Sequence, residues 1–171
     1  TLVEEYKKEN NNPVRITLST NASYLDIAEY LQREWQKIGI EVAIDVMPNS
    51  ALRQGMATGK VDFFRGSWIA DYPDAENYFS LFYSPNYAPN GPNYTHFKNE
   101  MFDLLYEKSF METDDEKRFD IYRKMDSIIV SEAPVIPLFY DKAIRFTSKK
   151  VDNLGVNPLN LLQLKKVKKS E

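Results

Sequence analysis

Residues 14–46 constrain the fold most, because they read as a strand, a helix and a second strand in close succession. Side chains over 14–18 alternate between apolar and polar, as in a half-buried strand. Apolar side chains then recur every three or four residues from Tyr24 to Ile38, and Gly39 ends this predicted helix. Over 42–46, side chains that suit a buried strand face again occupy every second position. The pattern predicts two parallel strands joined by a right-handed crossover.

The rest of the chain mixes helices, strands and loops, so the predicted fold class is α/β with mixed α+β character. After this unit we expect a short helix over 50–58, a third strand over 61–68, a short helix over 76–82 and a loop over 84–93. We then expect two helices, over 99–111 and from Thr113 to about Ser131, and two final strands, over 135–140 and 143–147. Capping boxes are predicted at Ser23 with Asp26 and at Thr113 with Glu116.

Composition excludes several classes of function. The 171 residues carry 22 Lys and Arg against 25 Asp and Glu, and this near balance argues against a sequence-independent nucleic-acid binder. The absence of cysteine excludes disulfide scaffolds, thiol catalysis and cysteine–zinc sites. The only histidine, His96, lies outside any nucleophile motif, so neither a Ser–His–Asp triad nor a metal or cofactor site is predicted. The chain also starts without an apolar leader, which indicates a mature product or an excised piece.

Carboxylates leave an enzymatic alternative open. Asp71, Asp74 and Glu76 lie close together but lack the spacing of a calcium loop. Any of many carboxylate pairs could serve a small α/β hydrolase or glycosidase, and the spacing selects none of them. A structural or interaction domain with aromatic contacts is a third hypothesis.

The segment from Arg65 to Asp74 is the most informative candidate site. It places Arg65, Trp68 and Asp71 at the end of a predicted strand, where open α/β sheets bind ligands. In a purely structural interpretation, Trp68 is core and Asp71 forms a turn. In a functional one, Asp71 is held partly out of water and binds a ligand ammonium, which contributes about 1.5–3 kcal/mol, while Trp68 forms a flat apolar wall.

Successive stretches carry a resemblance to a known family: Val14–Met47, which includes Trp35–Val42, then Gly59–Phe63, Trp68–Asp74, Asn93–Asp103 and Ala133–Tyr140. Together they resemble the C-terminal part of the family 5 extracellular solute-binding proteins, the dipeptide and oligopeptide receptors of ABC importers. The resemblance implies a two-lobe, type II periplasmic-binding-protein-like fold in a longer protein. Residues 1–133 would belong to the C-terminal ligand-binding lobe, and the strands within 134–171 would return toward a missing N-terminal lobe.

The resemblance also implies roles for individual residues. Asp71 would hold the α-ammonium of a peptide, and the backbone at Ser67 and Ile69 would pair with the peptide main chain. Trp68 would line the pocket, with Tyr72 as a further aromatic candidate, and Arg65 would meet a peptide carboxylate. Ser67 departs from the glycine that often precedes the tryptophan in the family. Because the family also includes receptors for nickel chelates, haem and oligosaccharides, the ligand is expected to be a peptide or a related small solute.

The same resemblance implies the setting of the protein. Its partners would be the solute and a membrane-embedded ABC importer, and it would lie in the cell envelope, in the periplasm or lipid-anchored outside the cytoplasmic membrane. It would not be an enzyme. If one wall of its cleft is missing, the isolated chain should bind ligand weakly or not at all. The apolar run 134–140, without its natural sheet, should then favour self-association.

Overall fold

The structure is a computed structural model and describes residues 2–142, 144–157, 159 and 161–170. The chain divides into two compact units. The first comprises Thr1–Ser67 with Tyr87–Tyr94, and the second comprises Trp68–Asn86 with Thr95–Glu171.

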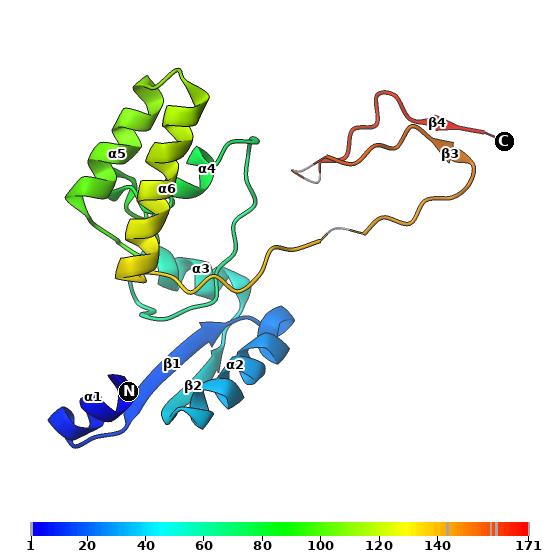
Figure 1. The fold of residues 1–171 in the computed structure, drawn as a ribbon. Helices are drawn as coiled ribbons and strands as arrows, with labels where there is room; N and C mark the ends of the chain where they lie inside the picture. Colours follow the sequence, from blue (N-terminus) through cyan, green and yellow to red (C-terminus); the bar gives the residue numbers. More distant parts are fainter. Residues whose placement is uncertain (1, 143, 158, 160, 171) are drawn as a thin grey trace. The chain divides into compact units, whose positions relative to one another are not determined.

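The first unit is built around the predicted strand–helix–strand motif (Figure 1). Its elements are α1 (Leu2–Asn10), β1 (Val14–Thr20), the 3-10 turn η1 (Ala22–Tyr24), α2 (Leu25–Lys37), β2 (Ile40–Val46) and α3 (Asn49–Ala57). The two strands are parallel, in a register that runs from Val14 opposite Ile40 to Thr20 opposite Val46. The predicted parallel unit is therefore confirmed, whereas α1 was not predicted.

The apolar alternation of the strands explains the core of this unit. Leu18 and Val42 point to the same face of the sheet and are buried with Ala28 of α2. Trp35 of α2 packs against Phe63, with ring centroids 5.7 Å apart. Because one helix face covers one sheet face, this core holds both strands in register.

The predicted third strand over 61–68 is wrong. Only Phe64 forms a parallel bridge, to Ser19 of β1, with hydrogen bonds from the Ser19 amide to the Phe63 carbonyl and from the Arg65 amide to the Ser19 carbonyl, both 2.9 Å. β1 ends one residue later, at Thr20, so no strand edge remains for residues 66–68 to pair with. Residues 65–70 consequently run on without regular structure.

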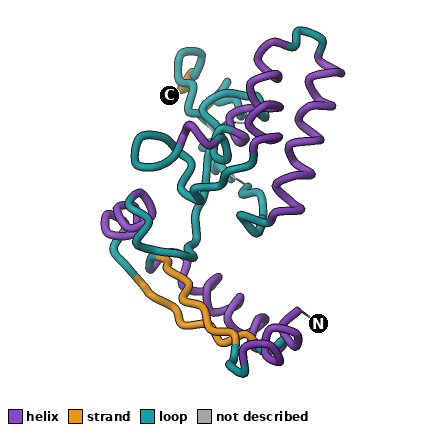
Figure 2. Tube along the Cα trace, turned by 90° about the vertical axis from the view of Figure 1, so that its left-hand side faces the viewer, coloured by secondary structure: helices purple, strands orange, loops and turns teal. Residues whose placement is uncertain are grey.

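The second unit is mainly helical. It contains α4 (Glu76–Phe79), the 3-10 turn η2 (Ser84–Asn86), α5 (Glu100–Met111), α6 (Asp115–Glu132) and the two-residue strands β3 (Val151–Asp152) and β4 (Lys168–Lys169). Helices α5 and α6 lie side by side, joined by a short loop (Figures 1 and 2). The residues buried between them and α4 are Phe79, Phe102, Tyr106, Ile121, Tyr122, Met125 and Ile129.

Helix ends in the chain differ in detail from the predicted capping boxes. The N-cap of α6 is Asp114, whose carboxylate accepts from the Lys117 amide at 3.1 Å, so the cap lies one residue beyond Thr113. Near α2, the Asn21 side chain accepts from the Ser23 amide instead of Ser23 acting as a cap. Aspartate and asparagine compete well with serine and threonine for such positions, and sequence spacing alone does not choose between them.

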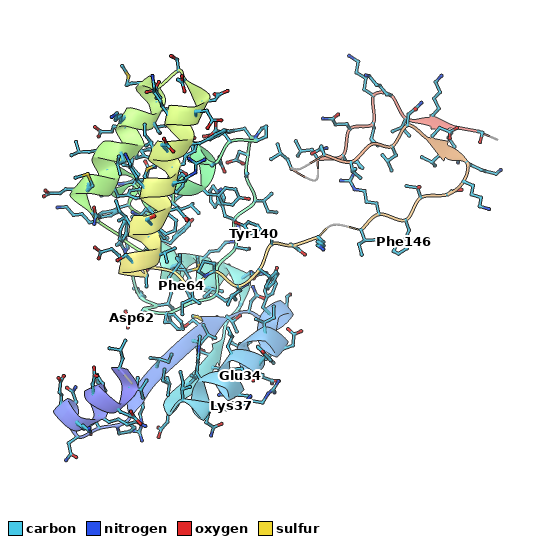
Figure 3. All side chains as sticks on the ribbon, in the orientation of Figure 1. Glu34, Lys37, Asp62, Phe64, Tyr140 and Phe146 are labelled. Atoms are coloured by element: carbon cyan, nitrogen blue, oxygen red, sulfur yellow. The ribbon has the colours of Figure 1, made fainter. Side chains whose placement is uncertain are left out.

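The chain beyond α6 does not form the two predicted strands. Residues 135–142 and 144–147 have no strand assignment, and Ala143 lies outside the described residues. A strand needs a neighbour, and no other described segment pairs with this one. Val135 packs against the helical core, but most of the other apolar side chains are exposed, including Tyr140 at 93% and Phe146 at 96% (Figure 3). Within the described part of the chain, no helix is long and apolar enough to cross a membrane.

Candidate functional site

The Trp68–Asp74 segment leads directly into α4, and one side chain of that helix holds it. The indole Nε1–H of Trp68 donates to Oδ1 of Asn77 at 2.7 Å. The backbone N–H of Asp71 donates to the same oxygen at 3.2 Å. Asn77 itself is only 4% exposed. A buried amide on a packed helix thus fixes the two residues that the sequence analysis singled out.

Helix α4 is anchored by a buried carboxylate. Glu76 is 5% exposed, and its carboxylate accepts hydrogen bonds from the hydroxyls of Tyr72 and Tyr106. Burial, followed by the bond to Glu76, raises the pKa of Tyr106 above its ordinary value. The hydrogen bond to Glu76, followed by burial, raises the pKa of Tyr72 as well. Both hydroxyls therefore remain protonated donors at neutral pH.

Asp74 is likewise engaged inside the second unit. Its carboxylate accepts from the Tyr122 hydroxyl at 2.8 Å and from the Glu76 amide at 2.9 Å, and it pairs with Arg118 at 2.8 Å. Burial on its own raises the pKa of Asp74. The hydrogen bonds from Glu76, Tyr122 and Arg118 outweigh burial, so the pKa of Asp74 lies below its ordinary value. Asp74 is thus a charged structural group that ties the start of α4 to α6.

Asp71 differs from both of its acidic neighbours. Its side chain is exposed, and among the described residues nothing bonds to its carboxylate. The prediction that Asp71 is held partly out of water is wrong for this chain, since residues 71–74 form bends and the Asp71 side chain is exposed. Of three acids that spacing could not distinguish, Asp71 is the one whose charge is left available for a ligand.

The residues around Asp71 offer both apolar surface and free backbone. Trp68 is half-buried, Ile69 is 76% exposed and Tyr72 is 44% exposed. The backbone N–H and C=O groups of residues 68–70 make no hydrogen bond to any described residue. Exposed, unpaired backbone of this kind can receive an extended peptide by strand-like pairing.

The two remaining candidates belong to the first unit. The Nη1 of Arg65 donates to the Ser67 hydroxyl at 3.2 Å. The guanidinium of Arg65 also lies over the ring of Tyr24, 3.2 Å from its centroid. Ser67 is exposed, and its backbone, like that of 68–70, has no partner among the described residues. Arg65 is therefore oriented by Tyr24, which the sequence analysis did not include among the candidate site residues.

No cluster suited to a metal ion occurs in the part of the chain that the structure describes. The sequence analysis missed Asn77 and considered Glu76 only as a calcium ligand or an enzymatic carboxylate, since a polar pair inside a short amphipathic segment normally faces water. The only available signal was their spacing from Phe79, which places them in the same helical turn.

Comparison with known proteins gives a consistent result. The model of the family described as bacterial extracellular solute-binding proteins, family 5 Middle, matches residues 2–90. The chain is 24% identical over 163 residues to the dipeptide-binding protein DppE of Bacillus subtilis, covering 93% of the chain and 29% of that relative. It is 29% identical over 147 residues to the probable deoxycholate-binding periplasmic protein YgiS of Escherichia coli, covering 84% of the chain and 27% of that relative.

Solved structures show the same fold. The complex of Haemophilus influenzae OppA with RPPGFSPFR superposes with a TM-score of 0.83 at 22% identity, covering 98% of the chain and 33% of that protein. The predicted type II periplasmic-binding-protein-like fold is thus confirmed. The chain spans about a third or less of the length of these proteins.

Proposed function

Because this chain belongs to the bacterial extracellular solute-binding proteins, family 5, we propose that it forms part of a receptor that captures peptides. In this proposal the Asp71 carboxylate binds the peptide α-ammonium, and the backbone of Ser67 and Ile69 pairs with the peptide main chain. Trp68 and Tyr72 provide the apolar wall. The receptor delivers its ligand to a membrane-embedded ABC importer.

One observation carries the proposal: the Asp71 carboxylate has no partner among the described residues, while its acidic neighbours are engaged. Asp74 is paired with Arg118 and Tyr122, and Glu76 is occupied by two tyrosine hydroxyls. A ligand cation therefore meets one uncommitted charge in this segment. That charge lies beside the unpaired backbone of residues 68–70. A free carboxylate next to unpaired backbone is what the N-terminal residue of a bound peptide needs.

In this proposal, Arg65 binds a carboxylate group of the peptide. Its guanidinium is stacked on Tyr24 and has one neutral partner, Ser67. A guanidinium without a carboxylate partner among the described residues can form a bidentate pair with a peptide carboxylate. The relatives named for dipeptides favour a ligand with both charges.

The proposal extends to the whole protein. Residues 1–133 belong to the C-terminal lobe, and the segments within 134–171 return toward the N-terminal lobe. The cleft between the lobes holds the solute, and hinge motion closes it. The receptor acts in the cell envelope, either in the periplasm or lipid-anchored outside the cytoplasmic membrane. The isolated chain, with one wall of the cleft missing, binds peptide weakly.

The enzymatic alternative has no support. A hydrolase or glycosidase would need a pair of carboxylates, and two of the three clustered acids are already committed to structural bonds. The relatives with which the chain was compared are named as binding proteins.

The test is a calorimetric titration of the full-length protein with a tripeptide and with its N-acetylated form. The wild type should prefer the free amine, and Asp71→Asn should remove that preference, with a loss of about 10- to 100-fold for the free amine, as expected for a charged hydrogen bond. Asp62→Asn is the matched control, since Asp62 is also an exposed aspartate (Figure 3). Equal binding of both peptides by the wild type would contradict the proposal.

A further inference from the structure

We infer that Asn77 is a positioning residue that holds the Trp68 indole and the Asp71 backbone in the orientation that binds ligand. The inference rests on the proposed function, because it assigns a purpose to the geometry of Trp68 and Asp71. Asn77 touches no ligand in this scheme and acts through the two residues that do.

The geometry is that of a single acceptor shared by two donors. Oδ1 of Asn77 accepts from Trp68 Nε1 at 2.7 Å and from the Asp71 amide at 3.2 Å. An amide oxygen has two lone pairs, so these donors use its full capacity. The first bond fixes one edge of the indole, and the second fixes the backbone from which the Asp71 carboxylate extends.

Asn77 is itself rigidly held. Its backbone amide donates to the Asp74 carbonyl at 3.2 Å, and its carbonyl accepts from the Ser80 hydroxyl at 2.7 Å. The helical residues on either side of it, Glu76 and Tyr78, differ in environment, since Glu76 is buried in the tyrosine network and Tyr78 is 41% exposed. The amide group therefore projects from a helix that the core of the second unit fixes in place.

Residues 68–71 have few other restraints in the described part of the chain. Among the described residues, the bonds from Trp68 and Asp71 to Asn77 are the only hydrogen bonds made by residues 68–71. Without them, the segment would have to lose conformational freedom when the ligand binds, and that entropy cost would reduce affinity. Asn77 thus prepares the site before the ligand arrives.

The test uses Asn77→Ala in the full-length protein, with titration of a tripeptide and its N-acetylated form. We expect affinity for the free-amine peptide to fall at least tenfold. Asn77→Gln keeps an amide oxygen as acceptor without adding a charge to this buried position and should recover part of the loss. Asn86→Ala is the matched control, because it removes an asparagine side chain whose bond, to the Ser80 carbonyl, involves neither Trp68, Asp71 nor Asn77. Trp68→Phe removes the indole donor without altering α4 and should reproduce part of the loss.

A spectroscopic readout separates positioning from general destabilisation. The indole N–H resonance of Trp68 should shift and the Asp71 amide should exchange faster in Asn77→Ala, whereas Asn86→Ala leaves both unchanged. If Asn77→Ala binds peptide like the wild type while Asp71→Asn does not, the inference is overturned and the proposed function stands. If the wild type shows no preference for the free amine, the proposed function fails. The inference then fails with it, because Trp68 and Asp71 no longer form the amine site that Asn77 would position.

Discussion

The guanidinium of Arg65 lies over the aromatic ring of Tyr24, with its central carbon 3.2 Å from the ring centroid. Arg65 follows the single bridge between Ser19 and Phe64, while Tyr24 ends the 3-10 turn before α2. The contact joins two segments of the first unit that are far apart in the sequence. It also fixes the direction of a charged side chain that the proposed function assigns to ligand carboxylates.

Removal of the Tyr24 ring should release Arg65. A cation over an aromatic face contributes about 0.5–2 kcal/mol, depending on how far it is desolvated. We expect a coupling energy in this range from a double-mutant cycle of Tyr24→Leu and Arg65→Met, measured by urea unfolding of the full-length protein. Tyr24→Phe keeps the ring and should leave the coupling intact. If Tyr24→Phe and Tyr24→Leu behave alike, the ring is not the partner of Arg65.

The first unit could be predicted because its sequence periodicity and its packing agree. Alternation on β1 and β2 places Leu18 and Val42 on the face that α2 covers, and the observed register follows from that burial. The third strand could not be judged in this way. Residues 61–68 do contain an apolar run, but whether they pair as a strand depends on where β1 ends. That end is set by the tertiary structure and cannot be inferred from the local sequence pattern.

The candidate site was only partly accessible from sequence. Trp68 and Asp71 could be identified from motif resemblance, yet spacing gave no means of ranking Asp71 above Asp74 or Glu76. That ranking comes from hydrogen-bond partners on α5 and α6, which lie about 30 to 50 residues further along the chain. Asn77 was missed for a different reason, because its role depends on the preceding loop folding back onto its own helix.

Asp74 should make the stability of the second unit depend on pH. Its pKa is lowered in the folded state, because hydrogen bonds from Glu76, Tyr122 and Arg118 outweigh the opposing effect of burial. A carboxyl of this kind stabilises the fold above its unfolded pKa, about 3.9, and that stabilisation is lost as the pH falls through the lower folded value. Asp74→Asn should therefore be less stable than the wild type at pH 7, by about 1.5–3 kcal/mol.

The difference between Asp74→Asn and the wild type should shrink as the pH falls below about 4, which urea unfolding between pH 7 and pH 2 can follow. Asp120→Asn is the matched control on α6. Asp120 pairs with Arg123, but both side chains are more than 60% exposed, and exposed pairs contribute little. A constant difference across the whole pH range would show that the Asp74 charge does not stabilise the fold.

Met125 should be among the most sensitive positions of the helical core. It is 0% exposed and packs within the cluster that includes Phe102 and Tyr122. Met125→Ala leaves a cavity between α5 and α6, so we expect the free energy of unfolding to fall by about 2–5 kcal/mol. Met111→Ala removes the same side chain at a position that is 83% exposed, and it should change stability by less than about 0.5 kcal/mol. Similar losses for the two variants in urea unfolding would contradict this account.

The extended segment after α6 should make the 171-residue chain self-associate. Exposed apolar side chains recur along it, with Phe139 at 57%, Tyr140 at 93% and Phe146 at 96% (Figure 3). Its backbone has no strand partner among the described residues, and an unpaired apolar strand is a template for a second chain. Both the apolar area removed from water and the strand pairing favour association over the isolated state.

Sedimentation equilibrium over a range of concentrations should therefore show a rising average mass for this chain. Replacing Phe139, Tyr140 and Phe146 together by serine should restore a monomer, because the substitutions remove the apolar contacts and leave the helical core untouched. Met111→Ser alters an equally exposed apolar residue on α5 and should not restore it. A strictly monomeric wild-type chain at high concentration would show that exposed apolar surface on this segment is not sufficient for pairing. If Met111→Ser were as effective as the triple variant, the contact would lie on the helices.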